Sequence, residues 1–307
     1  MKILLLGKNG QVGWELQRSL APLGELVALD RHSRDHCGDL SNLPGLASTV
    51  RALRPDVIVN AAAYTAVDNA QGDQNTARTI NADAPGVLAR EAAELGALLV
   101  HYSTDYVFNG SGHHAWAESD TPAPLSVYGQ TKLEGEQQIQ AAGSKHLIFR
   151  CSWVYAARGG NFAKTMLRLA QERERLTVID DQFGAPTGAE LLADVTAHAI
   201  RQVTIQPGDV GLYHVAAAGE TTWHAYAKHV LAHAKSACEA INIIATEVAP
   251  VASSAFVTAA ARPHNSRLNT HKLQTTFGLH LPDWRLGIDR MLAETLAGDA
   301  WRRAPTL

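Results

Sequence analysis

The sequence predicts an α/β fold in which a doubly wound parallel sheet is followed by a smaller C-terminal lobe. In the first half of the chain, short apolar runs alternate with longer segments of helical periodicity, which is typical of a parallel sheet covered by helices on both faces. A glycine-rich turn directly follows the first apolar run, and the second half lacks the regular alternation. These observations favour a fold of Rossmann type with an additional lobe.

The first half contains five expected strands and four expected helices. The strands are short apolar runs at residues 3–6, 26–29, 56–60, 97–102 and 146–150. The helices have apolar residues on one face, at residues 11–23, 41–53, 76–95 and 128–142. Ser41 is expected to cap the second helix, and Gly96 lies just past the end of the third. Residues 103–126 are rich in Gly, Ser, His and Pro and are expected to form a loop.

The second half is less regular. Helices are expected at residues 161–174, 190–202, 222–234 and 286–296, extended segments at 176–179, 211–215 and 242–248, and a loop at 249–261. We expect a dinucleotide-binding domain at residues 1–155 and a mainly substrate-binding lobe at residues 156–307. Because no clear linker separates the two, some segments of the second half are expected to return to the sheet.

The composition limits the classes of partner. The 307 residues are 46% hydrophobic and 19% charged, with a net charge of −3 and no basic block, so binding to nucleic acid or to an anionic membrane is not expected. Cys37, Cys151 and Cys238 are widely spaced, and they form neither a disulfide framework nor a zinc motif. With no apparent signal peptide and no membrane-spanning stretch, the expected location is the cytoplasm.

A turn with the spacing G-x-x-G-x-x-G joins the first expected strand to the first expected helix. Glycines here permit a tight turn and let the backbone approach a pyrophosphate at the helix N-terminus. The residues expected to contact a dinucleotide are Gly7, Gly10, Gln11, Val12 and Gly13. The alternative is a tight strand–helix turn without a ligand.

Three further segments are expected to contact the cofactor. Asp30 ends the second expected strand and can bind ribose hydroxyls, which favours NAD, whereas Arg31 could bind a 2′-phosphate. NADH and NADPH therefore both stay open. The loop after the second expected strand, with Asp39 and Leu40, could cover the adenine. Small residues after the third expected strand let the cofactor lie close to the backbone, in the segment Ala61, Ala62, Ala63, Tyr64 and Thr65. The alternative for Asp30 is a solvated strand end, and the alternative for the small residues is tight helix–sheet packing.

Tyr128 and Lys132 lie one helical turn apart, so their side chains share a helix face. An ammonium group beside a phenol is expected to lower the pKa of the phenol, because the positive charge favours the phenolate. Such a pair can donate a proton near neutral pH. Thr104 follows the fourth expected strand, where its hydroxyl can bind a carbonyl oxygen. Ser103 competes for this role, but neighbouring side chains of a strand point in opposite directions, and we favour Thr104.

Several distinctive stretches occur in one order along the chain. They are the glycine turn, residues 60–63 (NAAA), 103–108 (STDYVF), 128–136 (YGQTKLEGE), 150–155 (RCSWVY), 181–187 (DQFGAPT), 262–263 (RP) and 265–268 (NSRL). With these stretches the chain resembles the extended short-chain dehydrogenases/reductases and, from end to end, the dTDP-4-dehydrorhamnose reductases. The resemblance implies reduction of dTDP-4-dehydro-β-L-rhamnose to dTDP-β-L-rhamnose by NADPH or NADH, for cell-surface polysaccharides such as lipopolysaccharide.

The resemblance also implies roles for individual residues. Tyr128 would donate a proton to the developing alkoxide, Lys132 would also hold the nicotinamide ribose, and Thr104 would bind the carbonyl oxygen. Asp105 and Tyr106 would contact the sugar, although Asp105 could instead cap the following loop.

Two arginines of the second half, a tryptophan that follows the fifth expected strand and one strand residue complete the expected site. Trp153 suits the apolar face of a deoxysugar, with a core tryptophan as the alternative. Arg262 and Arg267 match the two phosphates of a nucleotide-sugar, with surface salt bridges as the alternative. Tyr102 is expected either to contact the cofactor or to pack.

A metal is expected only in a structural role. His229 and His233 are one helical turn apart, but the sequence shows no acid that completes a convincing set. The resemblance implies Mg²⁺ held at a homodimer interface, with Glu15, Glu190 and Glu294 in the matching motifs. Carboxylate oxygens suit Mg²⁺, and solvated surface acids are the alternative.

Three other functions compete with this interpretation. The chain could be a nucleotide-sugar 4-epimerase that retains NAD, or a reductase of another dTDP-4-keto sugar. It could also be a non-catalytic regulatory subunit, like the reductase-like regulators of methionine adenosyltransferase. The presence of Thr104, Tyr128 and Lys132 favours an enzyme.

Overall fold

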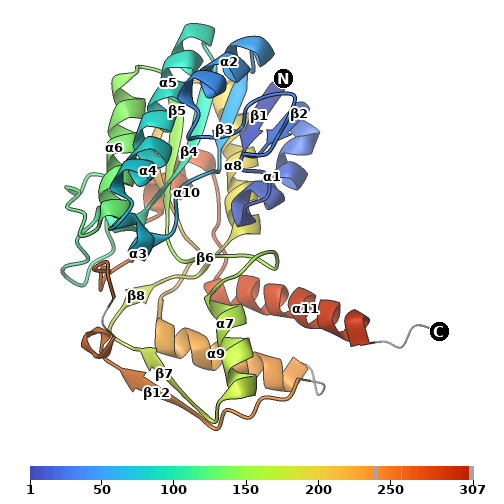
Figure 1. Ribbon diagram of the computed structural model, residues 1–307, viewed down its shortest axis with the longest axis vertical. Helices are drawn as coiled ribbons and strands as arrows, with labels where there is room; N and C mark the ends of the chain where they lie inside the picture. The colour runs from blue at the N-terminus through green and yellow to red at the C-terminus, as the bar shows by residue number, and fades with distance from the viewer. Residues whose placement is uncertain (238–240, 257, 304–307) are drawn as a thin grey trace.

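The fold is seen in a computed structural model, which describes residues 1–237, 241–256 and 258–303, with side chains up to residue 297. Cys238 lies outside the described residues. A parallel sheet with its helices forms the upper part of the molecule in Figure 1, and a smaller group of helices and strands forms the lower part. The expected fold class is confirmed.

The sheet has six strands in the order β10-β5-β4-β3-β1-β2, and every neighbouring pair is parallel. The strands are β1 (Lys2–Leu6), β2 (Glu25–Leu29), β3 (Val57–Asn60), β4 (Leu98–Thr104), β5 (Lys145–Cys151) and β10 (Gly211–Val215). The strand order reverses at β1, where β2 lies on one side and β3 on the other. In open α/β sheets, this reversal creates a crevice at the carboxyl ends of the strands, which is where ligands bind.

Helices cover both faces of the sheet. One face carries α1 (Gln11–Leu20), α8 (Ala189–Ile205) and α10 (His271–Phe277), and the other carries α2 (Leu43–Leu53), α5 (Ala84–Leu95) and α6 (Val127–Ala141). In β1, Ile3 and Leu5 pack on the first face, whereas Leu4 and Leu6 pack on the second. Alternation along a strand that is buried on both faces explains why the strand is apolar throughout.

The predicted strands and helices of the first half are all present, but their ends differ, one helix is divided, and a short helix at Val67–Ala70 was not predicted. Asn42, not Ser41, caps α2, because its side chain accepts a hydrogen bond from the Gly45 N–H at 3.0 Å. The predicted helix at 76–95 is divided into α4 (Gln74–Arg78), a π-helical turn (Thr79–Asp83) and α5. Pro85 has no N–H to continue the regular bonding across this turn.

The lower part is built around a second apolar core. It contains α7 (Phe162–Glu172), α9 (Trp223–Ala237) and α11 (Trp284–Arg303), together with the parallel pair β7 (Arg175–Ile179) and β12 (Glu247–Val251). Tyr226, Trp284 and Ile288 are buried among these helices. Short strands β6 (Val154–Tyr155), β8 (Phe183–Gly184), β9 (Thr187–Gly188) and β11 (Thr221–Thr222) lie between the two parts, and α3 (Val67–Ala70) follows β3.

The second half differs from the prediction in two places. The predicted strand at 242–248 is displaced, because β12 begins at Glu247 and continues to Val251 beside β7. The start of the predicted loop at 249–261 is therefore wrong. The helix α10 was not predicted; its Leu273 and Phe277 fill the core beside β10. As expected, segments of the second half return to the sheet, namely α8, β10 and α10. Among the described helices, none has the length and apolarity to cross a membrane.

A buried ion pair fastens α6 to the sheet. Glu136 of α6 accepts hydrogen bonds from Arg150 of β5 at 2.9 and 2.6 Å, and also from the Ser103 hydroxyl of β4. The Arg150 and Glu136 side chains are only 3% and 2% exposed. The Arg150 guanidinium also lies over the Phe108 ring, 5.0 Å from its centroid. Both charges are removed from water, so each depends on the other.

We predict that Glu136→Gln lowers the free energy of unfolding by about 3–5 kcal/mol, because it leaves the Arg150 charge buried and uncompensated. Urea denaturation followed by circular dichroism measures the change. The control is Glu172→Gln, which removes the acid of the exposed Arg168–Glu172 pair and should change stability little. A loss in Glu136→Gln no larger than in this control would contradict the prediction.

Candidate active site

The glycine turn brings the start of the chain against the end of β3. Gly7 has φ +86°, and a Cβ atom there would lie 2.8 Å from the Ala62 nitrogen. A Cβ atom on Gly13 would overlap the Gly7 carbonyl. Only glycine fits such an approach. The side-chain oxygen of Gln11 is buried at the start of α1 without a hydrogen-bond partner among the described residues. The first N–H groups of a helix have no partner within the helix, so they can bind an anionic ligand at its N-terminus. Together with the Gln11 oxygen, they make this turn suitable for a ligand with polar groups.

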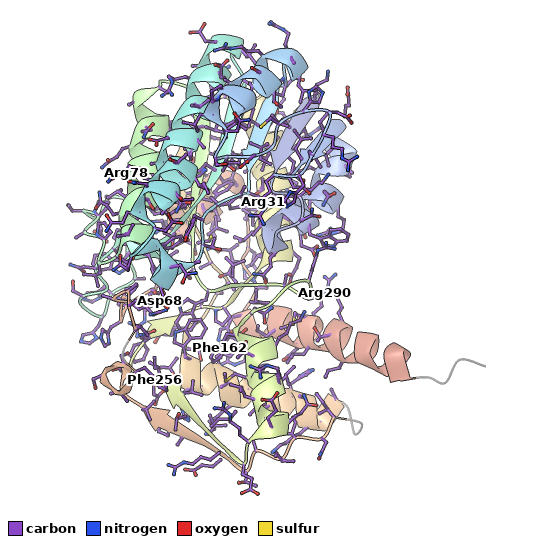
Figure 2. The ribbon with its side chains drawn as sticks, in the orientation of Figure 1. Arg31, Asp68, Arg78, Phe162, Phe256 and Arg290 are labelled. Atoms are coloured by element: carbon purple, nitrogen blue, oxygen red, sulfur yellow. The ribbon has the colours of Figure 1, made fainter. Side chains whose placement is uncertain are left out.

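Asp30 follows β2 at the same edge of the sheet. Its carboxylate accepts hydrogen bonds from the His32 N–H at 2.9 Å, from the Ser33 hydroxyl at 3.2 Å and from the Asn9 side chain. Partial burial opposes ionisation, but these hydrogen bonds and the charge of Lys8 hold the pKa of Asp30 below its ordinary value. The exposed Arg31 lies next to it (Figure 2). Asp30 is therefore an ionised acceptor beside the glycine turn.

The other expected cofactor residues occupy two loops near this edge. Asp39 accepts hydrogen bonds from the N–H and hydroxyl of Ser41, and Leu40 is buried in the core beneath α2. The segment after β3 is half-buried at Ala61, Ala62, Ala63 and Tyr64 and exposed at Thr65. The Tyr64 N–H and carbonyl are both bound by the Asn81 side chain, at 2.8 and 3.0 Å. Asn81 thus fixes the backbone of this segment.

Thr104 and Tyr128 meet where α6 begins over the end of β4, and Lys132 lies one turn further along the helix. Ser126 caps α6 through the Gly129 N–H, which places Tyr128 in the first turn of the helix. Burial raises the pKa of Tyr128, and a hydrogen bond with the Thr104 side chain opposes this effect. The Thr104 hydroxyl also accepts a hydrogen bond from the Tyr106 N–H at 3.1 Å. The two hydroxyls that the sequence assigns to one carbonyl oxygen therefore lie together.

The expected lowering of the Tyr128 pKa by Lys132 is wrong. The Lys132 ammonium does not face the phenol: it donates to the Tyr102 carbonyl at 2.6 Å and lies 3.1 Å from the His101 ring. Burial therefore dominates, and it raises the pKa of Tyr128 instead of lowering it. Burial also lowers the pKa of Lys132 to about 8.

Alternation along β4 separates the roles of its neighbours. The Tyr102 side chain lies on the face away from α6, with its hydroxyl 2.6 Å from that of Thr196 on α8. The Ser103 side chain points toward α6, where its hydroxyl donates to Glu136. Ser103 is thus engaged in the buried ion pair. The Thr104 hydroxyl donates to the Asp105 carboxyl group at 3.1 Å and takes no part in that ion pair, which favours Thr104 over Ser103 for contact with a ligand.

Asp105 and Tyr106 form the next turn beyond β4. Burial raises the pKa of Asp105 to about 7, although hydrogen bonds with Ser266 and Thr104 oppose this effect. One oxygen of this carboxyl group has no partner within the part of the chain that the structure describes. The Tyr106 ring packs edge-on against the Tyr128 ring, with centroids 5.7 Å apart. A partly protonated acid therefore lies beside the two hydroxyls.

Both expected phosphate-binding arginines are held in ion pairs. Arg262 binds Asp68 of α3 with its nearer contact at 2.6 Å, at the junction of the two parts (Figure 2). Arg267 binds Glu220 at 2.6 Å and lies over the Phe183 ring. The structure thus shows both arginines in salt bridges, which was the alternative to phosphate binding. An incoming phosphate could still compete with either carboxylate.

Trp153 lies between the two parts of the molecule. Its backbone is left-handed, with φ 48°, which is uncommon for a bulky residue. Its ring stacks on Trp223 at a centroid distance of 3.7 Å, and Phe162 packs on the other side of the stack, 4.6 Å from Trp223. Trp153 is half-buried, so the stack presents an aromatic edge and is not a fully enclosed core.

No assembled metal site is found in the described ranges, since no group of three or more His, Cys, Asp or Glu side chains could hold an ion. Glu15 pairs with Arg18 and Glu294 with Arg290, and the charges of Glu15 and Glu294 contribute to raising the pKa of Glu190 after its burial. His229 and His233 do share an acid, Asp289, which the sequence analysis missed.

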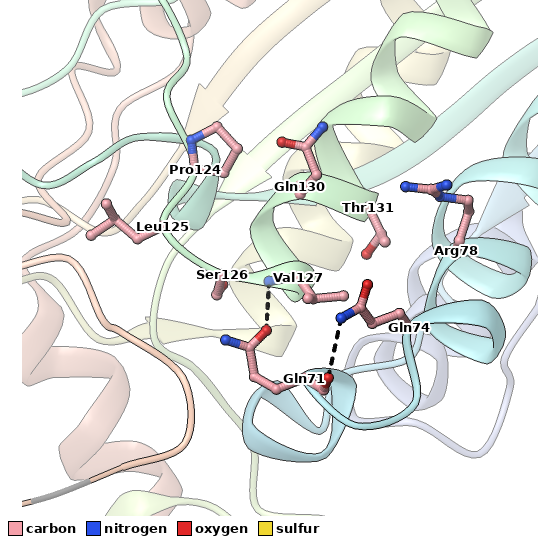
Figure 3. Close-up of a pocket in the computed structure, with 9 residues that line it drawn as sticks. All are labelled: Gln71, Gln74, Arg78, Pro124, Leu125, Ser126, Val127, Gln130 and Thr131. Atoms are coloured by element: carbon pink, nitrogen blue, oxygen red, sulfur yellow. Dashed lines mark hydrogen bonds between the residues drawn. The ribbon is translucent and has the colours of Figure 1, made fainter.

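A separate surface pocket of about 290 Å³ lies at the start of α6, on its outer side. Figure 3 shows that it is lined mainly by polar side chains of the helices after β3 and of the segment leading into α6. The Gln71 side chain accepts a hydrogen bond from the Val127 N–H at 3.1 Å in its floor. The pocket contains Thr131 and Gln130 but none of the three expected catalytic residues.

Sequence reasoning missed three residues that support the site. His101 and the side chain of Asn60 lie behind Lys132, and Ser266 binds Asp105. Strand alternation could have placed His101 on the same face as Ser103. No pattern in the sequence indicates that the segment containing Ser266 returns to the end of β4.

The chain is similar to known proteins over almost all of its length. The sequence model of the RmlD substrate binding domain matches residues 1–297. The dTDP-4-dehydrorhamnose reductase of Shigella flexneri is 60% identical over 294 residues, 96% of this chain and 98% of that protein. A solved dTDP-4-dehydrorhamnose reductase from Clostridium acetobutylicum has a TM-score of 0.85 at 33% identity and covers 95% of this chain and 98% of its own. The Bacillus anthracis enzyme, solved in complex with NADP, has a TM-score of 0.84 at 34% identity and covers 96% of this chain and 99% of its own.

We predict that Asp105→Asn makes the protein more stable than the wild type above pH 7. The pKa of Asp105 is about 7 in the folded chain and near 3.8 when it is unfolded, so the folded state holds the proton more tightly. This stabilisation is complete below pH 3.8 and is lost as the pH rises to 7. The stability difference between variant and wild type should grow over that window and then stay constant.

Denaturation curves recorded between pH 4 and 8.5 measure this difference. The matched control is Asp35→Asn at an exposed position. The stability difference between this variant and the wild type should not grow between pH 4 and 7. A pH-independent difference for Asp105→Asn would show that its carboxyl group has an ordinary pKa.

Proposed function

Because the chain belongs to the family of the RmlD substrate binding domain, whose similar members are named dTDP-4-dehydrorhamnose reductase, we propose that it reduces the 4-keto group of dTDP-4-dehydro-β-L-rhamnose to give dTDP-β-L-rhamnose. The reductant is NADPH or NADH. The observation that carries the proposal is the meeting of the Thr104 and Tyr128 hydroxyls at the carboxyl edge of the sheet, on the same edge as the glycine turn.

The residues present fit a nicotinamide dinucleotide. The glycine turn leaves room for a pyrophosphate over the N-terminus of α1, and the unpartnered Gln11 oxygen lies beside it. Asp30 is an ionised acceptor for ribose hydroxyls. Lys132 uses two of its three N–H groups within the chain, which leaves one for the nicotinamide ribose. When bound, the reduced cofactor supplies the hydride that the ketone carbon accepts.

The protein supplies the proton. Thr104 and Tyr128 would both hydrogen-bond the ketone oxygen, which makes the carbon more electrophilic. The buried phenol retains its proton at neutral pH, since its pKa is raised. It would transfer this proton as negative charge develops on the oxygen.

The contacts with the rest of the substrate follow from residues around this centre. Asp105 and Tyr106 lie directly beside the two hydroxyls and would contact the sugar ring. Trp153 offers an aromatic edge for its apolar face. Arg262 and Arg267 would bind the diphosphate by exchanging their carboxylate partners for phosphate oxygens.

Several finer features stay predictions. They are Mg²⁺ at Glu15, Glu190 and Glu294, a homodimer, a cytoplasmic location, a role in lipopolysaccharide synthesis, and the division into domains at residue 155. Glu15 and Glu294 lie close enough to Glu190 for their charges to raise its pKa, which supports the prediction that the three glutamates share an ion.

The deciding assay follows NADPH oxidation with dTDP-4-dehydro-β-L-rhamnose and, separately, with one other dTDP-4-keto sugar. Net oxidation with the first sugar only would support the proposal. Epimerisation without net oxidation, by protein that retains NAD on purification, would assign the chain to the epimerases. Oxidation with only the second sugar would assign it to another reductase, and no turnover of either sugar would favour the non-catalytic regulator.

We predict that Tyr128→Phe lowers the turnover number about 10²–10⁴-fold, because it removes the proton donor. NADPH affinity, measured by fluorescence titration, should remain close to that of the wild type. The matched control is Tyr102→Phe, which removes a hydroxyl on the opposite face of the sheet and should leave turnover close to the wild-type value. Near-normal turnover in Tyr128→Phe would exclude this role for the phenol.

We predict that Asp30→Ala weakens NADH binding more than NADPH binding, because the lost carboxylate would bind the free 2′-hydroxyl that only NADH carries. Dissociation constants for both cofactors measure the effect, with Asp35→Ala as the exposed control. Equal losses for the two cofactors would rule out the ribose-binding assignment.

A further inference from the structure

A buried polar chain lies behind Lys132 and links three elements of the sheet domain. Lys132 of α6, His101 of β4 and Asn60 of β3 are 2%, 1% and 1% exposed. The Lys132 ammonium nitrogen is 3.1 Å from His101 Nε2, and His101 Nδ1 is 3.2 Å from the Asn60 amide nitrogen. Asn60 and His101 are direct partners in the β3–β4 pairing. The reduction described above uses Lys132 but assigns no task to the other two residues.

Few other groups act on Lys132 from the surrounding elements. Burial disfavours its charged form, and Glu136 of the same helix favours it. The Cys151 thiol of β5 is uncharged near neutral pH, because burial raises its own pKa to about 12. Glu136 is already bound by Arg150 and Ser103. The neutral contacts that remain for the ammonium are the Tyr102 carbonyl and the His101 ring. Tyr128, one turn away, faces Thr104 instead.

His101 can serve as an acceptor only when its ring is neutral. Burial, together with the nearby charge of Lys132, holds the pKa of His101 well below its ordinary value, so the ring carries one proton. If Nε2 accepts from the ammonium, that proton is on Nδ1 and faces the Asn60 amide. An amide can be turned by 180° with little change in shape, and the Asn60 oxygen then accepts from Nδ1. In the structure the Asn60 oxygen accepts instead from the Ala62 N–H, in a long hydrogen bond of 3.2 Å, so the turned amide would replace that hydrogen bond.

We propose that His101 is a positioning residue for Lys132: its neutral ring, oriented by Asn60, accepts a hydrogen bond from the buried ammonium group and thereby keeps Lys132 protonated and directed toward the cofactor side of the site. The importance of this residue for turnover rests on the proposed reductase function, whereas its effect on Lys132 does not.

The contact matters because the pKa of Lys132 lies only slightly above physiological pH. Its pKa is about 8, so a further fall would discharge the side chain at physiological pH. A hydrogen bond to a charged group favours the charged form, and removal of the acceptor should therefore lower the pKa of Lys132. A neutral amine would lose its charge-assisted contact with a ribose hydroxyl.

The test compares three substitutions of His101 that keep or remove one acceptor position. His101→Gln places an amide oxygen near the position of Nε2 and should keep the contact with Lys132. His101→Asn reaches only the position of Nδ1, and His101→Leu offers no acceptor. We expect the pKa of Lys132 to stay close to the wild-type value in His101→Gln and to fall by about one unit or more in the other two.

The pKa of Lys132 is measured in the cofactor-free protein by NMR titration of ¹³C-labelled lysine, with the signal identified by its absence in Lys132→Met. The alkaline limb of the rate profile should move to lower pH by the same amount in His101→Asn and His101→Leu, while the KM for the dTDP-sugar changes little. A merely structural role would lower thermal stability without moving either titration.

Two outcomes would overturn the proposal. One is a Lys132 pKa that is unchanged or raised in His101→Asn and His101→Leu, and the other is an equal fall in all three variants. Should His101→Leu fail to fold, the polar pair His101→Gln and His101→Asn still decides between these results. If the wild type does not reduce the keto sugar, the proposed function fails, but the NMR titration still tests His101.

Discussion

The site depends on one constraint, which is the fixed position of α6 where it packs on β4. Tyr128, Lys132 and Glu136 follow one another at intervals of one helical turn, so they form one row on the face that covers the sheet. Glu136 binds Arg150, and Lys132 binds the Tyr102 carbonyl. Buried charges are costly unless each has its partner, so a shift of the helix along the strand would break both contacts. Lys132 and Glu136 therefore fix the position of Tyr128 against the end of β4.

The cofactor edge follows from the topology of the sheet. The strand order reverses at β1, and the loops after β1, β2 and β3 meet at that point. A Cβ atom on Gly7 would clash with the Ala62 backbone of the loop after β3, and one on Gly13 would overlap the Gly7 carbonyl within the turn itself. Close backbone packing at this point therefore fixes the shape of the turn that leads into α1.

The second half of the chain completes the site from the other side. Arg262 binds Asp68 of α3, and Ser266 binds Asp105 at the end of β4. These contacts place residues far apart in the sequence around one centre, between the two parts seen in Figure 1. Burial raises the pKa of Asp105, and the hydrogen bond with Ser266 opposes this rise.

The sequence by itself determined the parallel sheet, the glycine turn and the row from Tyr128 to Glu136, because each depends on local periodicity or on spacing within one element. It did not determine the end of β12, which is set by pairing with β7, or the cap of α2, where Asn42 and Ser41 are equally suitable residues. Only the tertiary structure decided that Lys132 faces His101, because that contact joins two elements whose relative register depends on packing across the sheet. For the same reason, it alone decided that burial, more than the neighbouring ammonium, controls the proton on Tyr128.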